Sequence, residues 1–167
     1  MADGPTVVVD IDIDAPPSDV WRLITDINLS ARFQDEFLEG EWIDDQPGLG
    51  ARFLGRNRMG DREWETTNYI AAYDPLRRFG WAVDDPELPG ATWTFILEPR
   101  RSGTHLTYRR VVGPGPSGLA AIIDRHPDRE EEFIERRDAV HREHMTAVLR
   151  GIKALAEEPQ AASPESS

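Results

Sequence analysis

Between residues 34 and 112, apolar side chains recur at every second position through six successive segments. A period of two is typical of half-buried β-strands, and Gly, Pro and Asp residues typical of turns separate the segments. A long stretch from Asp128 to Glu157 then carries its apolar residues at helical spacing. A sheet and one long amphipathic helix must bury their apolar faces against each other, so we expect the helix to cover the sheet.

The same patterns predict the individual elements. A strand is expected at residues 6–13, and six more at 37–44, 50–59, 63–73, 77–84, 91–98 and 104–112. Helical spacing follows two prolines over 15–26, a short helical turn is expected over 28–33 with Asn28 as its N-cap, and another helical piece over 119–125. The short connections favour hairpins. The expected fold class is α+β: a curved antiparallel sheet of about seven strands around a long C-terminal helix, with two short helices after the first strand.

Composition limits the classes of partner and compartment. The 167 residues predict one domain over 6–157, a flexible stretch at 1–5 and a disordered tail at 158–167. There is no cysteine, which excludes disulfides and thiolate chemistry and favours a cytoplasmic protein. No apolar run is long enough for a membrane span. The net charge, 19 − 31 = −12, argues against a nucleic-acid partner.

Three basic side chains interrupt the apolar stripe of the long helix. Arg137 lies near the centre of this stripe, with His141 and His144 on it or beside it. An unpaired buried guanidinium would be very unfavourable, so Arg137 must meet a carboxylate, water or a ligand anion. A structural ion pair with an acidic residue of the early strands and a ligand contact both stay open. The histidines are either hydrogen-bonded core or rim residues or ligand contacts, and without a third ligand we expect no metal.

Alternation also predicts which strand residues face the helix. If Ile70 is buried, the rule of two places Trp64, Thr66 and Asn68 on the inner face. The same alternation in the other strands places four more candidate site residues there: Trp81, Trp93, Tyr108 and Arg110. The tryptophans can line a pocket or fill a core. In strand 50–59 either Phe53, Gly55 and Asn57 face inward, or Leu54 and Arg56 do after a one-residue slip. A phenol and a guanidinium, as in Tyr108 and Arg110, can hold a carbonyl or enolate oxygen.

The order and spacing of several motifs resemble the START-like superfamily, which includes bacterial polyketide cyclases/dehydrases, Bet v 1-type proteins and lipid-transfer domains (SRPBCC, helix-grip). The motifs are Ile13–Trp21, Leu23–Asp26, Leu49–Phe53, Asp74–Trp81, Trp93–Pro99, Gly103–Thr107 and Gly151–Glu157. Together they extend over residues 6–157. The resemblance implies a deep cavity between the sheet and the last helix that receives an apolar or amphipathic molecule. It implies no common set of catalytic residues, so function must be argued from the site.

Two functions of different class follow. The first is binding of a hydrophobic small molecule, such as a polyketide-, lipid- or isoprenoid-like compound, without a cofactor. The alternative is a polyketide cyclase, aromatase or dehydrase, with His144, Tyr108 and Arg110 as candidate catalytic groups and Arg137 as a further partner. A regulator that binds proteins through its outer surface has only the acidic charge in its favour. In a binding protein, Arg137→Ala should lower ligand affinity more than the melting temperature.

Overall fold

The computed structural model of the protein describes residues 6–45, 48–113 and 124–158. The strands are β1 (Thr6–Ile13), β2 (Phe37–Trp42), β3 (Arg52–Met59), β4 (Arg62–Asp74), β5 (Arg78–Val83), β6 (Ala91–Arg100) and β7 (Gly103–Val112). The helical elements are α1 (Pro17–Ile24), the 3-10 helices η1 (Leu29–Arg32) and η2 (Pro127–Arg129), and the long α3 (Glu130–Glu157).

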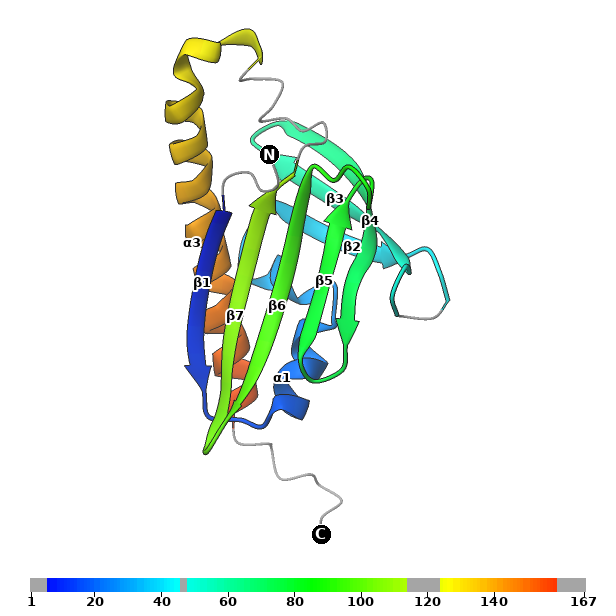
Figure 1. The fold of residues 1–167 in the computed structure, drawn as a ribbon, viewed down its shortest axis with the longest axis vertical. Helices are drawn as coiled ribbons and strands as arrows, with labels where there is room; N and C mark the ends of the chain where they lie inside the picture. Colours follow the sequence, from blue (N-terminus) through cyan, green and yellow to red (C-terminus); the bar gives the residue numbers. More distant parts are fainter. Residues whose placement is uncertain (1–5, 46–47, 114–123, 159–167) are drawn as a thin grey trace.

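The seven strands form one antiparallel sheet in the order β1-β7-β6-β5-β4-β3-β2 (Figure 1). Strands β2 to β7 follow one another as hairpin neighbours, as their short turn-rich connections predict. The first strand instead pairs with the last, from Thr6 opposite Val111 to Ile13 opposite Thr104. The curved sheet and the long C-terminal helix confirm the predicted helix-grip architecture.

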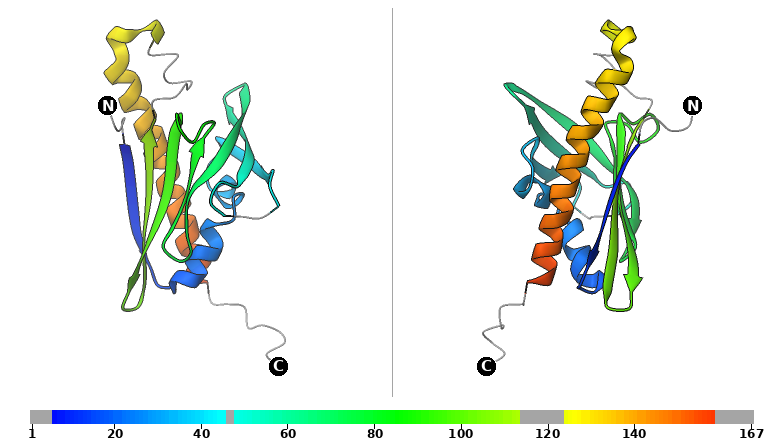
Figure 2. Two further views of the ribbon diagram at one scale, coloured as in Figure 1. Left: turned by 45° about the vertical axis from the view of Figure 1, so that its right-hand side comes forward. Right: turned by 90° about the vertical axis from the view of Figure 1, so that its left-hand side faces the viewer.

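Helix α3 crosses one face of the sheet, and α1 lies between its C-terminal part and the strands (Figure 2). The buried core is concentrated there. Its α3 residues are Met145, Val148, Leu149 and Ile152, which are at most 3% exposed. They meet Val20 and Ile24 of α1 and the inward residues of β1, β5, β6 and β7. The N-terminal half of α3 contributes few buried apolar residues, which leaves that end of the sheet without a packed apolar cover.

Most predicted boundaries differ from the observed ones by one or two residues, because hydrogen-bond pairing fades at strand ends. The largest corrections are in the helices. The first helix is shorter than 15–26, and residues 128 and 129, the start of the predicted long helix, belong to the 3-10 helix η2. Asn28 precedes η1 but makes no side-chain cap; its amide instead pairs with both backbone groups of Gly40 in β2. Most of the expected piece 119–125, the stretch 1–5 and residues 159–167 lie outside the described residues.

Gly151 fixes how the chain after α1 lies against α3. A side chain at Gly151 would collide with the ring of Phe33, which closes η1. The glycine therefore lets the aromatic ring pack directly on the helix backbone. This contact holds the start of the segment between η1 and β2 against the C-terminal half of α3. Among the described residues, no helix is long and apolar enough to cross a membrane.

Candidate functional site

A cavity of about 630 Å³ lies between the inner face of the sheet and α3. Pockets for small organic ligands typically measure roughly 300–1,000 Å³, so the volume is of ligand size. Strands β3 to β7 line one side, α3 lines the other, and residues of α1 and the segment Leu29–Phe37 complete the lining. The sequence predicted a helix that covers a sheet, and the structure shows that the two do not fill the space between them.

All seven strand residues predicted to face inward line this cavity. They are Trp64, Thr66 and Asn68 of β4, Trp81 of β5, Trp93 of β6, and Tyr108 and Arg110 of β7. The open choice of register in β3 is also decided. Phe53 and Asn57 line the cavity, and Gly55 is buried on the same face, whereas Arg56 is exposed.

The polar pair of β4 is held by local contacts. Asn68 is only 3% exposed, and its amide nitrogen donates to Thr66 Oγ1 at 3.2 Å. A side chain at Gly55 on the neighbouring strand would approach Asn68 Nδ2 and Thr66 Oγ1 to 3.0 and 3.1 Å. The glycine thus leaves room for the two polar groups on the cavity wall.

Aromatic rings form the broadest part of the lining. Trp81 and Trp93 stack with ring centroids 6.3 Å apart, and Phe95 stacks on Tyr108 at 4.0 Å. Both tryptophans remain partly exposed, which places them at the cavity and not wholly in the core. Trp21 and Trp42 have packing roles, since Trp21 meets Tyr73 and Phe79 while Trp42 meets Phe53. The stacked rings offer a flat apolar surface to a ligand.

Three polar residues surround Trp93, and we call Tyr108, Arg110 and His141 the polar wall. The ring centroids of Tyr108 and His141 lie 5.7 and 5.4 Å from that of Trp93, and Arg110 Cζ lies 5.5 Å from it. All three residues are at most 7% exposed. Arg110 Nε and Nη1 and His141 Nε2 are buried without a hydrogen-bond partner in the part of the chain that is described.

The protonation states of the polar wall follow from burial. Desolvation lowers the pKa of Arg110 to about 10, so its guanidinium stays charged at pH 7. Desolvation, reinforced by the charges of Arg110 and Arg137, lowers the pKa of His141 to about 2, so its imidazole stays neutral. Burial raises the pKa of Tyr108, which remains a phenol. The wall therefore presents one cation beside two neutral polar groups.

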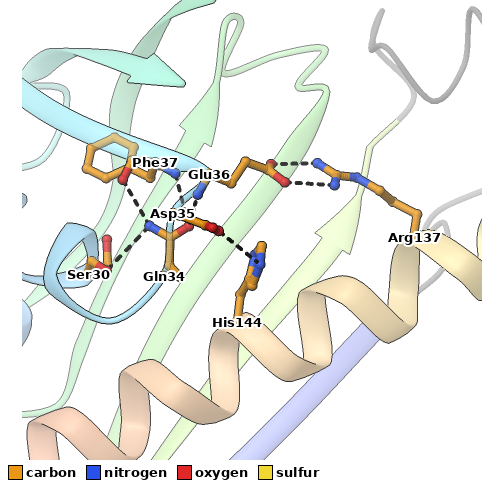
Figure 3. A network of polar contacts seen from close by, with 7 residues as sticks. All are labelled: Ser30, Gln34, Asp35, Glu36, Phe37, Arg137 and His144. Carbon is orange, nitrogen blue, oxygen red and sulfur yellow. Dashed lines mark hydrogen bonds and ion pairs between the residues drawn. The ribbon is translucent and has the colours of Figure 1, made fainter. Parts of the chain in front are cut away.

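Arg137 meets a carboxylate, as one of its two expected roles required. Its Nη1 and Nη2 donate to the two carboxylate oxygens of Glu36 at 2.8 and 2.6 Å, and both side chains are largely buried (Figure 3). Gln34 holds the backbone around Glu36, because its Oε1 accepts from the amides of Glu36 and Phe37 at 2.8 and 2.9 Å. The ion pair bridges α3 and the segment before β2.

The two histidines of α3 differ in setting. His144 is partly exposed and lies 3.9 Å from an oxygen of Asp35, whose side chain is almost fully exposed (Figure 3). His141 is buried, yet its Nε2 has no partner among residues 6–45, 48–113 and 124–158. The expectation of a hydrogen-bonded core histidine is therefore wrong for His141 Nε2. The two histidines, one helical turn apart, thus differ in burial and in their neighbours.

Sequence reasoning missed the acidic groups near the site. Glu36 was not singled out, although an acidic residue of the early strands was one of the two partners left open for Arg137; Glu36 lies directly before β2. Asp138 was also missed; its Oδ1 is buried without a hydrogen-bond partner within the described ranges. Residues 36 and 137 are 101 positions apart, and nothing in the local pattern of either points to the other. For Asp138 the sequence does hold a clue: it lies three residues before His141, and residues at this spacing are neighbours on a helix surface.

Comparison with known proteins agrees with this geometry. Residues 5–157 match a family described as polyketide cyclase / dehydrase and lipid transport. The Polyketide_cyc-like protein Cgl2372 from Corynebacterium glutamicum is 30% identical, with a TM-score of 0.66 over 93% of this chain and 96% of that one. None of the curated proteins matches the sequence.

Two more distant structures show the fold alone. The di-domain ARO/CYC StfQ from the steffimycin biosynthetic pathway is 17% identical with a TM-score of 0.72, over 92% of this chain and 50% of StfQ. The chain thus spans half the length of that protein. Ara h 8.0201 is 12% identical with a TM-score of 0.60, over 93% of this chain and 99% of that one. With its family match over almost the whole length, the chain belongs to the polyketide cyclase/dehydrase and lipid transport family of the START-like superfamily.

Proposed function

We propose that the protein binds an apolar or amphipathic small molecule of polyketide, lipid or isoprenoid type in the cavity between the sheet and α3. The observation that carries this proposal is the unfilled volume of about 630 Å³. Protein interiors are normally packed as densely as organic crystals, with few voids larger than a water molecule. The cavity opens to solvent, since exposed residues such as Arg62 and Arg136 line part of it, and a concave space of this size is typical of sites for small organic molecules.

The lining matches such a ligand. Stacked indole rings of Trp81 and Trp93 supply a broad apolar surface. Polar groups are few and sit at defined places, with Thr66 and Asn68 on β4 and the polar wall on β7 and α3. A mostly apolar pocket with a few placed polar groups is typical of sites for small organic molecules.

A pair of tryptophan substitutions on α3 tests the proposal. Val140 lines the cavity, whereas its neighbour Ala139 is exposed. Val140→Trp should fill part of the cavity, and Ala139→Trp should leave it open. With the fluorescent probe N-phenyl-1-naphthylamine, we expect Val140→Trp to weaken binding at least about 10-fold and Ala139→Trp to leave it unchanged.

Native mass spectrometry of the freshly purified protein complements this titration, because a co-purifying molecule would identify the ligand directly. If the wild-type protein does not bind the probe, or if both tryptophan variants bind it as the wild type does, the cavity is not a ligand site.

A second candidate function is catalysis on the bound molecule, as a cyclase, aromatase or dehydrase. The observation in its favour is that His144, Tyr108 and Arg110 all line the cavity, so that a histidine, a phenol and a charged guanidinium face the same volume. In an intramolecular aldol reaction a base removes a proton from a carbon next to a carbonyl, and that carbon attacks a second carbonyl. This attack forms the C–C bond that closes the ring; the alkoxide takes up a proton, and loss of water then leaves a C=C bond in the ring. Arg110 and Tyr108 would stabilise the enolate oxygen.

Incubation with a synthetic poly-β-ketone thioester tests this alternative. Cyclisation and loss of water are measured by mass spectrometry, in the wild type and in His141→Gln, His144→Gln and Tyr108→Phe. A catalyst should form the cyclic product above the uncatalysed rate, with a loss of roughly 100-fold or more in at least one of the three variants. Equal product with and without the protein would contradict catalysis on this substrate class and leave binding as the function.

A further inference from the structure

The guanidinium of Arg110 is the least satisfied charge that the structure describes at the cavity. The residue is 7% exposed, and its Nε and Nη1 have no hydrogen-bond partner in residues 6–45, 48–113 and 124–158. It contacts the face of Trp93, at 5.5 Å from Cζ to the ring centroid, and Asp138 and Glu36 favour its charge from a distance. Stacking on an aromatic ring offsets only part of the loss of hydration of a buried cation. Arg110 therefore lacks a counter-charge.

The nearby carboxylates do not supply this counter-charge. Both oxygens of Glu36 are bound by Arg137. Asp138 is near enough to influence Arg110 electrostatically, but no ion pair within 4.0 Å joins them, and Asp138 is not part of the cavity lining. Arg110 itself lines the cavity. The unfilled volume is thus the space from which a partner for Arg110 can come.

Two further groups around Trp93 fit the same partner. Tyr108 carries a hydroxyl on the same strand and face as Arg110, and His141 approaches from α3 with an unpartnered Nε2 in the described structure. Both rings lie within 6 Å of the indole of Trp93, measured between centroids. A carboxylate oxygen accepts hydrogen bonds from guanidinium, phenol and imidazole N–H alike. The aromatic surface beside these groups would hold the apolar body of the same molecule.

We propose that the polar wall is an anion subsite, in which Arg110 binds the carboxylate of an otherwise apolar, aromatic or alkyl ligand while Tyr108 and His141 hydrogen-bond to the same group. This inference rests on the proposed binding function and narrows its ligand class to organic acids. Neutral molecules with the same body would bind more weakly, because they leave the charge of Arg110 without a partner.

A matched pair of competitors tests the inference. The fluorescent probe N-phenyl-1-naphthylamine reports binding in the cavity, and 2-naphthoate and methyl 2-naphthoate then compete with it. The two competitors share a naphthalene body and differ in the charge of the acid group. We expect the wild-type protein to prefer naphthoate over the ester by about 10-fold or more, the effect of one charge-assisted hydrogen bond.

Three variants identify the residue responsible. Arg110→Met and Arg110→Gln should both abolish the preference for naphthoate: binding of naphthoate should weaken, whereas binding of the ester should not. Arg109→Gln removes the same charge from the exposed face of β7 and should keep the preference. Melting temperatures are measured in parallel, and Arg110→Met should not lower them, since it removes an unpaired buried charge.

The possible failures are distinguishable. If the wild-type protein binds neither the probe nor the competitors, the binding function and the anion subsite both fail. If the probe binds but naphthoate and its ester compete equally, or if the preference survives in Arg110→Met, the cavity is a ligand site without this subsite. A large drop in melting temperature in Arg110→Met with the preference intact would show that Arg110 is a structural partner of Asp138 instead.

Discussion

Two arginines reach the same cavity and differ in how their charges are balanced. Arg137 of α3 shares a bidentate ion pair with Glu36, and both side chains are at most 20% exposed. Arg110 of β7 is more deeply buried, yet two of its guanidinium nitrogens have no partner within the described ranges. The first arginine joins two parts of the fold. The second points at an unfilled volume.

A buried charge that the protein itself pairs and a buried charge without a partner affect stability differently. A buried cation paired by the protein stabilises the fold when its hydrogen bonds are complete, and removing one partner is then destabilising. A buried cation without a partner lowers the stability of the empty protein, and a ligand that supplies the missing charge recovers the difference. Natural proteins tolerate such unsatisfied groups mainly at functional sites. This contrast is the reason why we propose Arg110, and not Arg137, as the arginine that binds the ligand.

The largest expected effect is on stability at the Glu36–Arg137 ion pair. Arg137→Met should lower the free energy of unfolding by about 2–3 kcal/mol, because Glu36 is left buried without its partner. Arg110→Met should change it by less than about 1 kcal/mol or increase it. Denaturant unfolding of both variants measures the contrast. This ranking revises the expectation from sequence alone that Arg137→Ala affects ligand affinity more than melting.

The double variant Glu36→Gln/Arg137→Met controls for the loss of the charges themselves. It should be more stable than Arg137→Met alone, because no unpaired carboxylate remains. Equal stability of the single and double variants would mean that the ion pair does not couple α3 to the segment before β2.

The second effect is a loss of about 2 kcal/mol in the free energy of unfolding at pH 5, and it arises because His141 is neutral in the folded protein. Its pKa is lowered to about 2 in the folded protein, whereas an unfolded histidine titrates near 6.5. Below pH 6.5 the unfolded state therefore binds one more proton than the folded state. Stability should fall on acidification by up to about 1.4 kcal/mol per pH unit. Unfolding at pH 7, 6 and 5 should show this slope in the wild type and a smaller one in His141→Gln.

A wild-type slope equal to that of His141→Gln would indicate that His141 takes up its proton in the folded state. The imidazole would then be solvated from the cavity, and the polar wall would not be the dry site that its burial indicates.

A smaller loss in the free energy of unfolding, about 1 kcal/mol, is expected for a substitution at Gly151. Gly151→Ala places a methyl group against the ring of Phe33, and overpacking of this kind costs about 1–3 kcal/mol. The higher helix propensity of alanine offsets about 1 kcal/mol of that. Because Phe33 positions the segment that carries Glu36, the variant should also weaken the coupling between Glu36 and Arg137 in a double-mutant cycle. Naphthoate preference, which depends on Arg110, should stay as in the wild type.

The smallest effect comes from His105, on the outer face of β7. Its ring nitrogens lie 2.7 Å from Asp12 Oδ1 and 3.0 Å from Asp10 Oδ2 in β1, and the bond to Asp12 raises the pKa of His105. This contribution is fully present below pH 6.5 and is lost as pH rises through the raised folded pKa. It has the opposite sign to that of His141. Exposure of the carboxylates limits it to less than about 1 kcal/mol.

A titration of the His105 ring by nuclear magnetic resonance checks the direction of this shift. The pKa should lie above that of an unfolded histidine at low salt and move toward it at 1 M salt. A pKa at or below the reference value would show that neither Asp10 nor Asp12 pairs with His105 in solution.

Much of the architecture was predictable because it depends on short-range periodicity. Alternation along 63–73 placed Trp64, Thr66 and Asn68 on one face, and the structure has all three at the cavity. The helical stripe likewise placed Arg137 and His144 toward the sheet. Predictions failed where one residue could satisfy its hydrogen bonds in more than one way. Asn28 was expected to cap a helix, but its amide found a better pair of partners in the backbone of Gly40, twelve residues away.

No local sequence pattern could predict which charged residues at the site are paired with each other. Arg110 and Arg137 look alike in sequence, each a basic residue on an otherwise inward-facing surface. Which of them finds a carboxylate depends on how η1 docks on α3, and that docking depends on the contact between Gly151 and Phe33. His141 and His144 likewise sit one turn apart, and only the packing of Trp93 against His141 separates a buried neutral ring from a partly exposed one.

By itself the sequence determined the elements, their order and the faces they bury, because hydrophobic period and turn chemistry act over a few residues. Only the tertiary structure decided that helix and sheet enclose about 630 Å³ instead of a packed core. It also decided that Arg137 is neutralised by Glu36 while Arg110 is left to the cavity. Both outcomes depend on distances between groups about a hundred residues apart or on different elements, and such distances are set by the packing of the whole chain.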